Sequence, residues 1–542
     1  MAENEFDYVI VGAGAAGCAM AYRLTEDPSV RVLLLESGPP NTHPFIHMPK
    51  GIGKALSRPD LIWPYMTEPG PDSNNLPEVW ARGKTLGGST SLNGMMYVRG
   101  QPADYDEMAR TAGPEWGWDH IGKAYRAMES HELGRAETRG DSGPLHISMP
   151  TMKNALTEAL IEAGVAMGLP RKSDVNMPDN GEGVGYAPRT VYRGRRESAA
   201  VAFLEPIRKR KNLIVETGVL VDRLQFEGRR AVAVLASRGG SPVTYRANRE
   251  IHLAAGALAS PALLQRSGVG PADHLKSIDV KLVHDSPNVG RNMREHRAMV
   301  MQWKVRDELS FNAGHMGARL VANVGRYYLK KDGLMAAATY ELGAWFNTRP
   351  GLDRPDGQFL IAPYSFDYSK TVMAIESFGG MQICAYYLRP ESSGSLRIRS
   401  SDPHAFPIIE PNYHGEKSDR VAMIKVARTA REYVRQSPLE GMVHEETRPG
   451  ADFASDDEII AAYDRFGNGA YHASGTCRAG VDDDAVVDSR LNVRGIEGVR
   501  VIDTSILPFL VAGNTGGPAM VTAWRAADLV IEDQWSVHQS GQ

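Results

Sequence analysis

Cysteine is scarce in this chain of 542 residues, which contains only Cys18, Cys384 and Cys477. Three cysteines cannot form a disulfide framework, and an odd number suits a reducing compartment. The sequence also lacks Asn-x-Ser/Thr glycosylation sites and any continuously apolar stretch of the ~20 residues that a membrane-spanning helix needs. We therefore expect a cytoplasmic protein without a transmembrane segment.

A secretory signal is also missing. The apolar segment 8–22 could be mistaken for the core of a signal peptide, but Glu3, Glu5 and Asp7 precede it. A secretory signal begins with basic residues instead. This start of the chain agrees with the cytoplasmic expectation.

The chain has no excess of positive charge and no metal-site pattern. Its 61 Lys and Arg against 65 Asp and Glu give a net charge of −4, which offers no electrostatic case for nucleic acid as a partner. The H-E-x-x-H and paired-cysteine patterns of metal sites and the G-x-S-x-G pattern of serine hydrolases are absent. With 42% hydrophobic and 23% charged residues, the composition is typical of globular proteins, and the length favours two domains.

A glycine-rich turn lies between a predicted strand and a predicted helix near the start of the chain. The apolar segment 6–11 predicts a buried strand, and an Ala-rich helix follows to about Leu24. Between them, Gly12, Gly14 and Gly17 form a G-x-G-x-x-G pattern. The first glycine permits the tight turn, the second permits close approach of a pyrophosphate, and the third lets helix and strand pack closely. The helix N-terminus then offers free N–H groups to phosphate.

Glu36 ends the next predicted strand, which covers 31–36. A carboxylate at this position of a βαβ unit can accept hydrogen bonds from ribose hydroxyls and would repel a 2′-phosphate. The turn and Glu36 together predict dinucleotide binding, and they do not distinguish FAD from NAD.

The rest of the chain indicates a discontinuous nucleotide domain. Three segments, 214–215, 219–226 and 231–235, predict one β-meander. A late strand at 499–502 and a final helix over about 517–533 return to the nucleotide domain, whereas 300–460 carries no nucleotide pattern. We therefore expect a second domain inserted into the first.

A second run of small residues occupies 82–94. It is not a P-loop, because Lys84 precedes the glycines. Taken alone, it is either a structural loop or a loop whose backbone passes close to a flat ligand.

Together with three later stretches, this run resembles the GMC (glucose–methanol–choline) oxidoreductase family of FAD-dependent, alcohol-oxidising enzymes. The stretches that carry the resemblance are 86–94, 256–270, 389–413, and 471–477 with Asp503, Asn514 and Thr515. The resemblance extends over nearly the whole chain and is nearest to bacterial choline-dehydrogenase-like and sorbose-dehydrogenase-like members.

The resemblance implies an α/β fold (α+β overall) in which a Rossmann-type FAD-binding domain carries an inserted substrate domain built on an antiparallel sheet. The implied FAD-binding domain comprises 1–155, 190–300 and 465–542, and the implied substrate-binding domain comprises 156–189 and 301–464. The implied FAD contacts are Gly12, Gly14, Ala15, Gly17, Glu36, Gly87, Asn93, Gly94, Val221, Asp503 and Thr515.

One departure from the family concerns how FAD is attached. Some relatives bind FAD covalently through a histidine immediately before the asparagine of the 86–94 signature. Here that position is Leu92, which has no nucleophile. The departure predicts non-covalent FAD.

Two residues are candidates for catalysis. Oxidising an alcohol requires a base for the hydroxyl proton, and histidine suits that role near neutral pH. The chain has 15 histidines, and the resemblance places the base at His472, before the segment 474–477. Asn514 alone would be a turn residue or a helix cap. The resemblance places a His or Asn there, facing the substrate oxygen.

The expected reaction is FAD-dependent oxidation of a primary alcohol to an aldehyde, with oxygen, a quinone or another carrier as electron acceptor. The alternative is a lyase or decarboxylase of the same fold without net substrate oxidation. A flavin-binding protein with an inactive site is a third possibility, and the presence of both His472 and Asn514 weighs against it.

The identity of the alcohol stays open. Choline would need a carboxylate or an aromatic cage for its cation, and the sequence places neither. Cys477 is expected to pack in the core rather than react. The aromatic residues that either line an apolar pocket or belong to the core are Trp63, Tyr65, Tyr364, Phe366, Tyr386 and Tyr387.

Overall fold

Strand β1 (Glu5–Val11) lies inside the first sheet of the computed structural model, which describes residues 4–370 and 374–540. Its neighbours are β2 (Val32–Glu36) and β13 (Ser241–Leu253), both parallel to it. The last four residues of β1 and all of β2 are buried. Continuous apolar runs are typical of parallel strands covered on both faces.

The strand order of this first sheet is β10–β2–β1–β13–β12–β11, with β26 also paired to β13. The further strands are β10 (Leu213–Thr217), β11 (Val219–Glu227), β12 (Arg230–Arg238) and β26 (Val499–Val501). Strands β11, β12 and β13 form an antiparallel meander, whereas β10 runs parallel to β2 at the opposite edge. The prediction that 214–215 belongs to the meander was therefore wrong. Gly218, with a φ of +70°, lets the chain turn away between β10 and β11.

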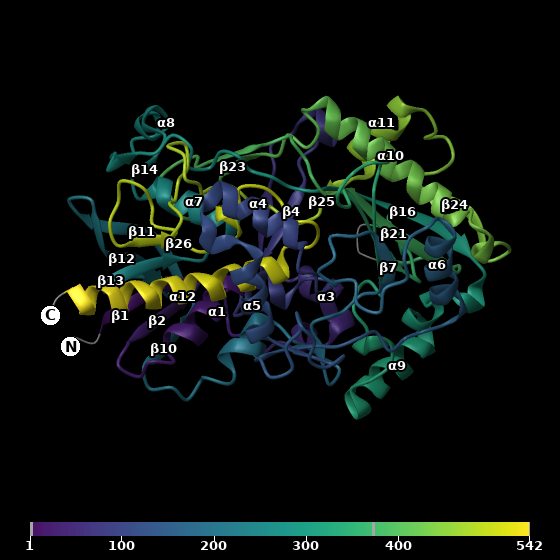
Figure 1. The fold of residues 1–542 in the computed structure, drawn as a ribbon, viewed down its shortest axis with the longest axis horizontal. Coiled ribbons are helices and arrows are strands. Elements are labelled where there is room, and N and C mark those ends of the chain that lie inside the picture. The colour runs from purple at the N-terminus through teal and green to yellow at the C-terminus, as the bar shows by residue number, and fades with distance from the viewer. Residues whose placement is uncertain (1–3, 371–373, 541–542) are drawn as a thin grey trace.

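Two helices pack together against this sheet. Helix α1 (Ala15–Leu24) follows the glycine turn, and α12 (Gly516–Ser540) lies along it. Figure 1 shows α12 beside α1, β1 and β2, with both chain ends on the same side of the molecule. Residues from both ends of the sequence therefore share one hydrophobic core.

The second sheet is entirely antiparallel. Its order is β24–β16–β21–β18–β17–β7, with β25 also paired to β16. The strands are β7 (Gly183–Tyr186), β16 (Arg297–Val305), β17 (Leu342–Phe346), β18 (Gly357–Ala362), β21 (Gly380–Tyr387), β24 (Val443–Arg448) and β25 (Asn468–Gly469). The first sheet, whose central strands are parallel, and the antiparallel second sheet together confirm the predicted fold class.

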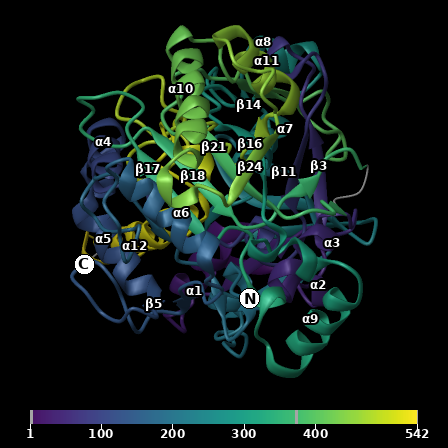
Figure 2. The same cartoon turned by 90° about the vertical axis from the view of Figure 1, so that its right-hand side faces the viewer.

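Alternation along the strands of the second sheet separates a helix-packed face from a cavity-lining face. On β16, Met299, Met301 and Trp303 belong to a core shared with α6 (Ala155–Ala166) and α10 (Lys417–Val434). Figure 2 shows α6 and α10 in front of this sheet. The intervening residues of three strands line a cavity instead. They are Ala298, Val300, Leu360, Cys384 and Tyr386. Because side chains alternate between faces, the sheet thus forms one wall of the candidate site.

Shorter elements complete the fold. The other helices include α2 (Pro44–His47), α3 (Ile52–Leu56), α4 (Pro102–Ala112), α5 (Trp118–Met128), α7 (Gly256–Arg266), α8 (Ala272–Ser277), α9 (Gly317–Lys330) and α11 (Asp456–Phe466). A hairpin of β3 (Ile62–Met66) and β4 (Val79–Gly83) contributes residues to the cavity wall. In the part of the chain that the structure describes, no helix combines the length and the hydropathy needed to cross a membrane.

Candidate active site

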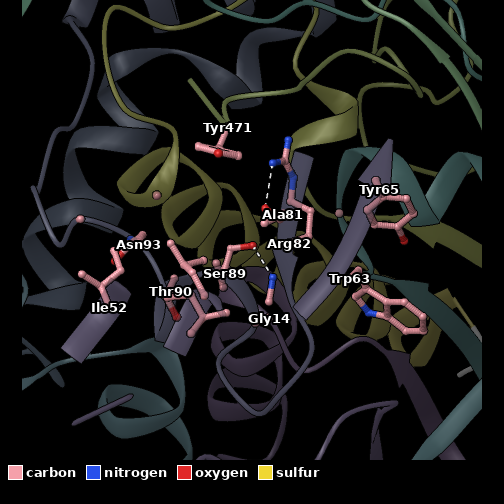
Figure 3. A pocket seen from close by; sticks show the side chains of 18 of the residues that line it. Gly14, Ile52, Trp63, Tyr65, Ala81, Arg82, Ser89, Thr90, Asn93 and Tyr471 are labelled. Carbon is pink, nitrogen blue, oxygen red and sulfur yellow. Dashed lines mark hydrogen bonds between the residues drawn. The ribbon is translucent and has the colours of Figure 1, made fainter. Parts of the chain in front are cut away.

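A cavity of about 1200 Å³ lies where the two sheets face each other. Figure 3 looks into it, with Gly14, Asn93 and Tyr471 among the residues that line it. The predicted site residues that line it are Gly12, Gly14, Ala15, Glu36, Asn93, Gly94, Val221, His472, Asp503, Asn514 and Thr515. Gly17 and Gly87 do not line it. The fold thus brings eleven predicted residues to one cavity from segments up to 503 positions apart (Gly12 to Thr515).

The first glycine turn is shaped so that one of its glycines leaves space for a ligand. Gly12 has a φ of +103°, and a Cβ there would lie 2.6 Å from the Ala254 carbonyl oxygen. A Cβ on Gly17 would lie 1.9 Å from the Gly12 oxygen, so Gly17 serves close packing of α1 on the turn. A Cβ on Gly14 would meet no protein atom nearer than 4.0 Å. The free volume at Gly14 belongs to the cavity.

The second glycine run packs directly on the first. The Gly87 N–H donates to the Ala13 carbonyl at 2.7 Å, and a Cβ on Gly88 would lie 2.8 Å from the Gly14 Cα. Gly87 has a φ of +88° and shapes this turn from behind, whereas Gly88 lines the cavity. Two glycine loops that are distant in sequence therefore form one continuous edge of the cavity.

Glu36 lies at the carboxyl end of β2, beside the first glycine turn. Its carboxylate accepts hydrogen bonds from the Gly38 N–H at 2.8 Å and the Ala13 N–H at 3.2 Å. Burial raises the pKa of Glu36 to about 7, and these two N–H donors oppose the rise. A buried carboxylate with remaining acceptor capacity is suited to bind hydroxyl groups.

Asp503 follows β26 and joins two elements of the cavity wall. Its carboxylate accepts from the Gly256 N–H at 2.8 Å, the Ser260 hydroxyl at 2.5 Å and the Ser505 N–H at 2.9 Å. Asp503 therefore fixes the start of α7 against the end of β26.

His472 is paired with a second histidine that the sequence reasoning did not identify. The Nδ1 atoms of His472 and His296 lie 2.9 Å apart, and His296 Nε2 lies 3.0 Å from the Leu388 carbonyl oxygen. A carbonyl only accepts, so His296 Nε2 carries a proton and donates it to Leu388. Neutral His296 Nδ1 must then accept, and His472 Nδ1 is the donor between the two rings. The lone pair of neutral His472 is therefore on Nε2, the atom that lies beside Asn514.

Asn514 contacts that lone pair. Its Nδ2 lies 3.2 Å from His472 Nε2, and its Oδ1 lies 3.5 Å from the Gln358 amide nitrogen. Since Nε2 is the acceptor, the amide of Asn514 donates toward it. The structure thus brings the two predicted catalytic residues together across 42 positions of sequence.

Burial keeps the two imidazoles neutral. It lowers the pKa of His472 well below 6.5, with His296 and Arg82 adding repulsion, and it lowers the pKa of His296 to about 4. A neutral imidazole can accept a proton, so this environment suits a base.

Glu295 holds both histidines through the backbone. Its carboxylate accepts from the His472 N–H at 2.7 Å and the His296 N–H at 3.0 Å. Arg82, whose guanidinium lies beside the ring of Tyr471, faces the same carboxylate at 3.7 Å (Figure 3). Tyr471 has a φ of +65°, an unfavourable conformation for a residue with a Cβ, at the position just before His472.

The predicted aromatic residues divide between cavity and sheet. Trp63, Tyr65, Tyr364, Phe366 and Tyr386 line the cavity, and Tyr387 does not. Cys477 is fully buried in the core of the first sheet, as expected for a packing residue.

Two glycine-rich turns and a buried, neutral histidine that line one cavity are typical of nucleotide-dependent oxidoreductases. Profiles described as GMC oxidoreductase match residues 6–298 and 390–523. The chain belongs to the GMC oxidoreductase family, which confirms the resemblance seen in the sequence.

Individual relatives agree with the family over the full chain. An oxygen-dependent choline dehydrogenase of Burkholderia pseudomallei is 39% identical and covers 98% of this chain and 94% of its own length. The mitochondrial choline dehydrogenase of Mus musculus is 36% identical, with 97% and 90% covered. Among solved structures, pyridoxine 4-oxidase from Mesorbium loti has a TM-score of 0.88 at 31% identity, with 97% and 99% covered. A formate oxidase of Aspergillus oryzae RIB40 has a TM-score of 0.92 at 25% identity, with 98% and 99% covered.

The protein is accordingly an FAD-dependent oxidoreductase that acts on alcohols. The alternative of a lyase or decarboxylase receives no support from these relatives. The residues present fit FAD. Gly14 leaves open space at the glycine turn, and Glu36 offers carboxylate oxygens at the carboxyl end of β2.

Replacing Glu36 by Ala should weaken FAD binding about 10- to 100-fold, the effect of losing hydrogen bonds to one charged group. Chemistry in the fraction that retains flavin should change less, because Glu36 accepts N–H groups at the glycine turn and not at His472. The dissociation constant can be measured by titrating FAD into apoprotein, with Glu36→Gln as the variant that keeps one acceptor oxygen. An unchanged affinity in Glu36→Ala would remove this residue from the cofactor site.

Proposed function

We propose that this protein oxidises a primary alcohol to an aldehyde, with His472 as the base and with FAD held non-covalently. The hydrogen-bonded series from the Leu388 carbonyl through His296 to His472 carries the proposal. It leaves the Nε2 lone pair of His472 as the acceptor for a hydroxyl proton.

The roles of the two catalytic residues follow from their atoms. His472 Nε2 takes the proton of the alcohol, and the resulting imidazolium keeps its Nδ1–H hydrogen bond to His296. The same base can therefore be held in one orientation before and after proton transfer. Asn514 lies at Nε2, where its amide N–H can turn to the alcohol oxygen and stabilise the negative charge that develops there. When bound, FAD supplies the acceptor for the hydride that leaves the alcohol carbon.

The two sheets support the proposed division into domains except at its boundaries, because the start of β16 (Arg297–Val305) and all of β25 (Asn468–Gly469) lie in segments assigned to the first domain but belong to the second sheet. Segments 1–155, 190–300 and 465–542 would form the FAD-binding domain around the first sheet. Segments 156–189 and 301–464 would form the substrate-binding domain around the second. The cavity would then hold the dinucleotide along the glycine loops and the alcohol along the antiparallel sheet.

Non-covalent attachment of FAD makes a direct prediction. Leu92 lines the cavity at the position before Asn93 and has no nucleophilic atom. Acid precipitation of the purified protein should release all of its flavin into the supernatant as intact FAD. Flavin that stays with the precipitate, or a flavin-labelled peptide after proteolysis, would contradict the proposal.

An alcohol panel tests the reaction itself. Primary alcohols of different charge and size are added to the flavin-loaded protein without oxygen, and the flavin absorbance and the aldehyde are followed together. Loss of the oxidised-flavin spectrum with equal formation of aldehyde supports the proposal. If every alcohol leaves the flavin oxidised and no aldehyde forms, the proposal is contradicted.

We propose oxygen as the acceptor, since relatives are named as an oxygen-dependent dehydrogenase and as oxidases. Reoxidation by oxygen compared with a quinone or a dye tests that part. The cytoplasmic location stays a prediction.

Choline is the substrate named for the dehydrogenase relatives and is therefore the first alcohol to test. The charges around this cavity, however, favour a different kind of alcohol.

A further inference from the structure

The carboxylates that line the cavity already bind donors of the protein. Within the described residues they are Glu36, Glu78 and Asp503. Glu36 and Asp503 accept the hydrogen bonds given above, and Glu78 accepts from the Tyr413 hydroxyl at 2.6 Å and pairs with Arg297. A cationic substrate would therefore find each of these three lining carboxylates already bound to a protein donor.

Part of the aromatic lining of the cavity is already paired with protein cations. Five rings that line it each have a cation over one face. The pairs, with distances from cation to ring centroid, are Lys84 over Trp63 at 4.3 Å, Lys50 over Tyr364 at 4.1 Å, Arg448 over Tyr368 at 4.0 Å, Lys331 over Tyr328 at 5.0 Å and Arg82 over Tyr471 at 5.6 Å. A quaternary ammonium group binds to free ring faces and is repelled by neighbouring cations. These five rings are therefore unsuited to such a group.

The wall formed by the second sheet adds no negative charge. Ala298 and Val300 of β16 and Leu360 of β18 present apolar side chains to the cavity. An apolar part of the substrate can pack there.

Lys50 lines the cavity and has no acceptor among the described residues. Its ammonium lies over the Tyr364 ring, and no described residue accepts a hydrogen bond from it or forms an ion pair with it within 4.0 Å. Burial lowers the pKa of Lys50 to about 8, so the amine is mostly protonated at neutral pH. The side chain is partly buried and lines the cavity, so its N–H donors can bind an acceptor that a ligand supplies.

Lys50 belongs to a small network of charges. It interacts electrostatically with Glu341 and Arg189, and Arg189 also interacts with Glu132. Neither oxygen of Glu341 accepts a hydrogen bond from a described residue, and burial raises the pKa of this carboxyl. Burial also lowers the pKa of the neighbouring His315 to about 3, so this ring adds no compensating or further charge at neutral pH.

Lys50 lies toward the second sheet rather than along the glycine turn of the cofactor cradle. The hydroxyl of Tyr364 donates to the Thr339 carbonyl at 2.6 Å, and the Thr339 N–H donates to the Gly94 carbonyl at 3.2 Å. Together with the neighbouring His315, these contacts place Lys50 on the side of the cavity formed by residues 312–366.

We propose that the site selects an alcohol with an apolar body and an anionic group, such as a carboxylate, that binds Lys50, and that it discriminates against quaternary ammonium alcohols such as choline. This inference rests on the proposed function for the oxidation of the alcohol. The contact between Lys50 and an anionic group does not depend on that function. The apolar part would lie on Ala298, Val300 and Leu360, and the anionic group would pair with the ammonium over Tyr364.

The test compares three alcohols and one non-reacting ligand on the flavin-loaded protein. The alcohols are 4-(hydroxymethyl)benzoate, benzyl alcohol and choline, and the ligand is 4-methylbenzoate, whose binding is followed by the change in flavin absorbance. The wild type should prefer 4-(hydroxymethyl)benzoate to choline in kcat/KM. Lys50→Met should weaken 4-methylbenzoate binding and reduce the preference for 4-(hydroxymethyl)benzoate over benzyl alcohol by about 10- to 100-fold, as expected for one charged hydrogen bond. Lys50→Arg should retain most of this preference.

Controls separate the substrate contact from general charge and from the cofactor. Lys123→Met removes the same charge from an exposed lysine on α5, outside the cavity, and should leave the preference unchanged. Higher kcat/KM for choline, unaltered 4-methylbenzoate binding in Lys50→Met, or an equal loss of FAD affinity in that variant would each overturn the inference. If 4-methylbenzoate binding depends on Lys50 but no alcohol is oxidised, the proposed function fails while this binding site remains supported.

Discussion

Replacing His472 by Ala should slow anaerobic flavin reduction by an alcohol by about 10²–10⁴-fold while FAD stays bound. That range is the usual contribution of a positioned general base. His472 Nε2 is the acceptor at the end of a hydrogen-bonded series from Leu388 through His296, so its loss leaves the hydroxyl proton without an acceptor. Stopped-flow absorbance of the flavin under anaerobic conditions measures the rate constant directly.

The matched control is a histidine that lies outside the cavity. His444 is exposed on β24, and His444→Ala should reduce its flavin at the wild-type rate. A His472→Ala protein that retains FAD and reacts at near wild-type speed would place the base elsewhere.

Asn514→Ala should have the second-largest effect. The amide lies 3.2 Å from the base and can donate to the alcohol oxygen as negative charge develops. Losing a hydrogen bond to a charged group costs about 1.5–3 kcal/mol. This corresponds to a decrease of roughly 10- to 150-fold in the rate constant for flavin reduction.

A variant that keeps a donor provides the control for Asn514. Asn514→His retains an N–H group at this position and should lose less activity than Asn514→Ala. Equal rates for Asn514→Ala and the wild type would mean that the amide is only a turn residue before α12.

The shape of the first glycine turn was predictable because it depends on local backbone geometry. Gly12, Gly14 and Gly17 form a short motif between a strand and a helix. Gly12 and Gly17 pack as their spacing indicates, and Gly14 leaves open space. Glu36 was found for the same reason, since it ends the next strand of the same βαβ unit. Gly87 is different, because it shapes the second loop while Gly88 contacts the cavity, and the sequence gives no sign of which neighbour turns inward.

The partner of the base was not predictable from sequence. His296 lies 176 positions before His472 and has no motif of its own among 15 histidines. Its role depends on the start of β16, which places it against Leu388 and His472, and pairing between distant strands leaves no local signal. The error about β10 has the same origin. An apolar strand pattern indicates burial but not which strand lies beside it.

Lys50 illustrates the same limit for specificity. In sequence it is one lysine in a loop rich in Gly and Pro. Only the fold places it over Tyr364 without an acceptor and beside Arg189 and Glu341. A family resemblance can therefore predict the reaction without predicting the charges that surround the substrate.

The pH dependence of anaerobic flavin reduction tests the central claim most directly, with a non-ionising alcohol as substrate. His472 acts as a base only when neutral, and burial lowers its pKa well below 6.5. The wild-type rate constant should therefore stay constant through neutral pH and decrease only in acid, and the slow His472→Ala variant should lack that acid limb. An acid limb that persists unchanged in His472→Ala would show that another group accepts the proton.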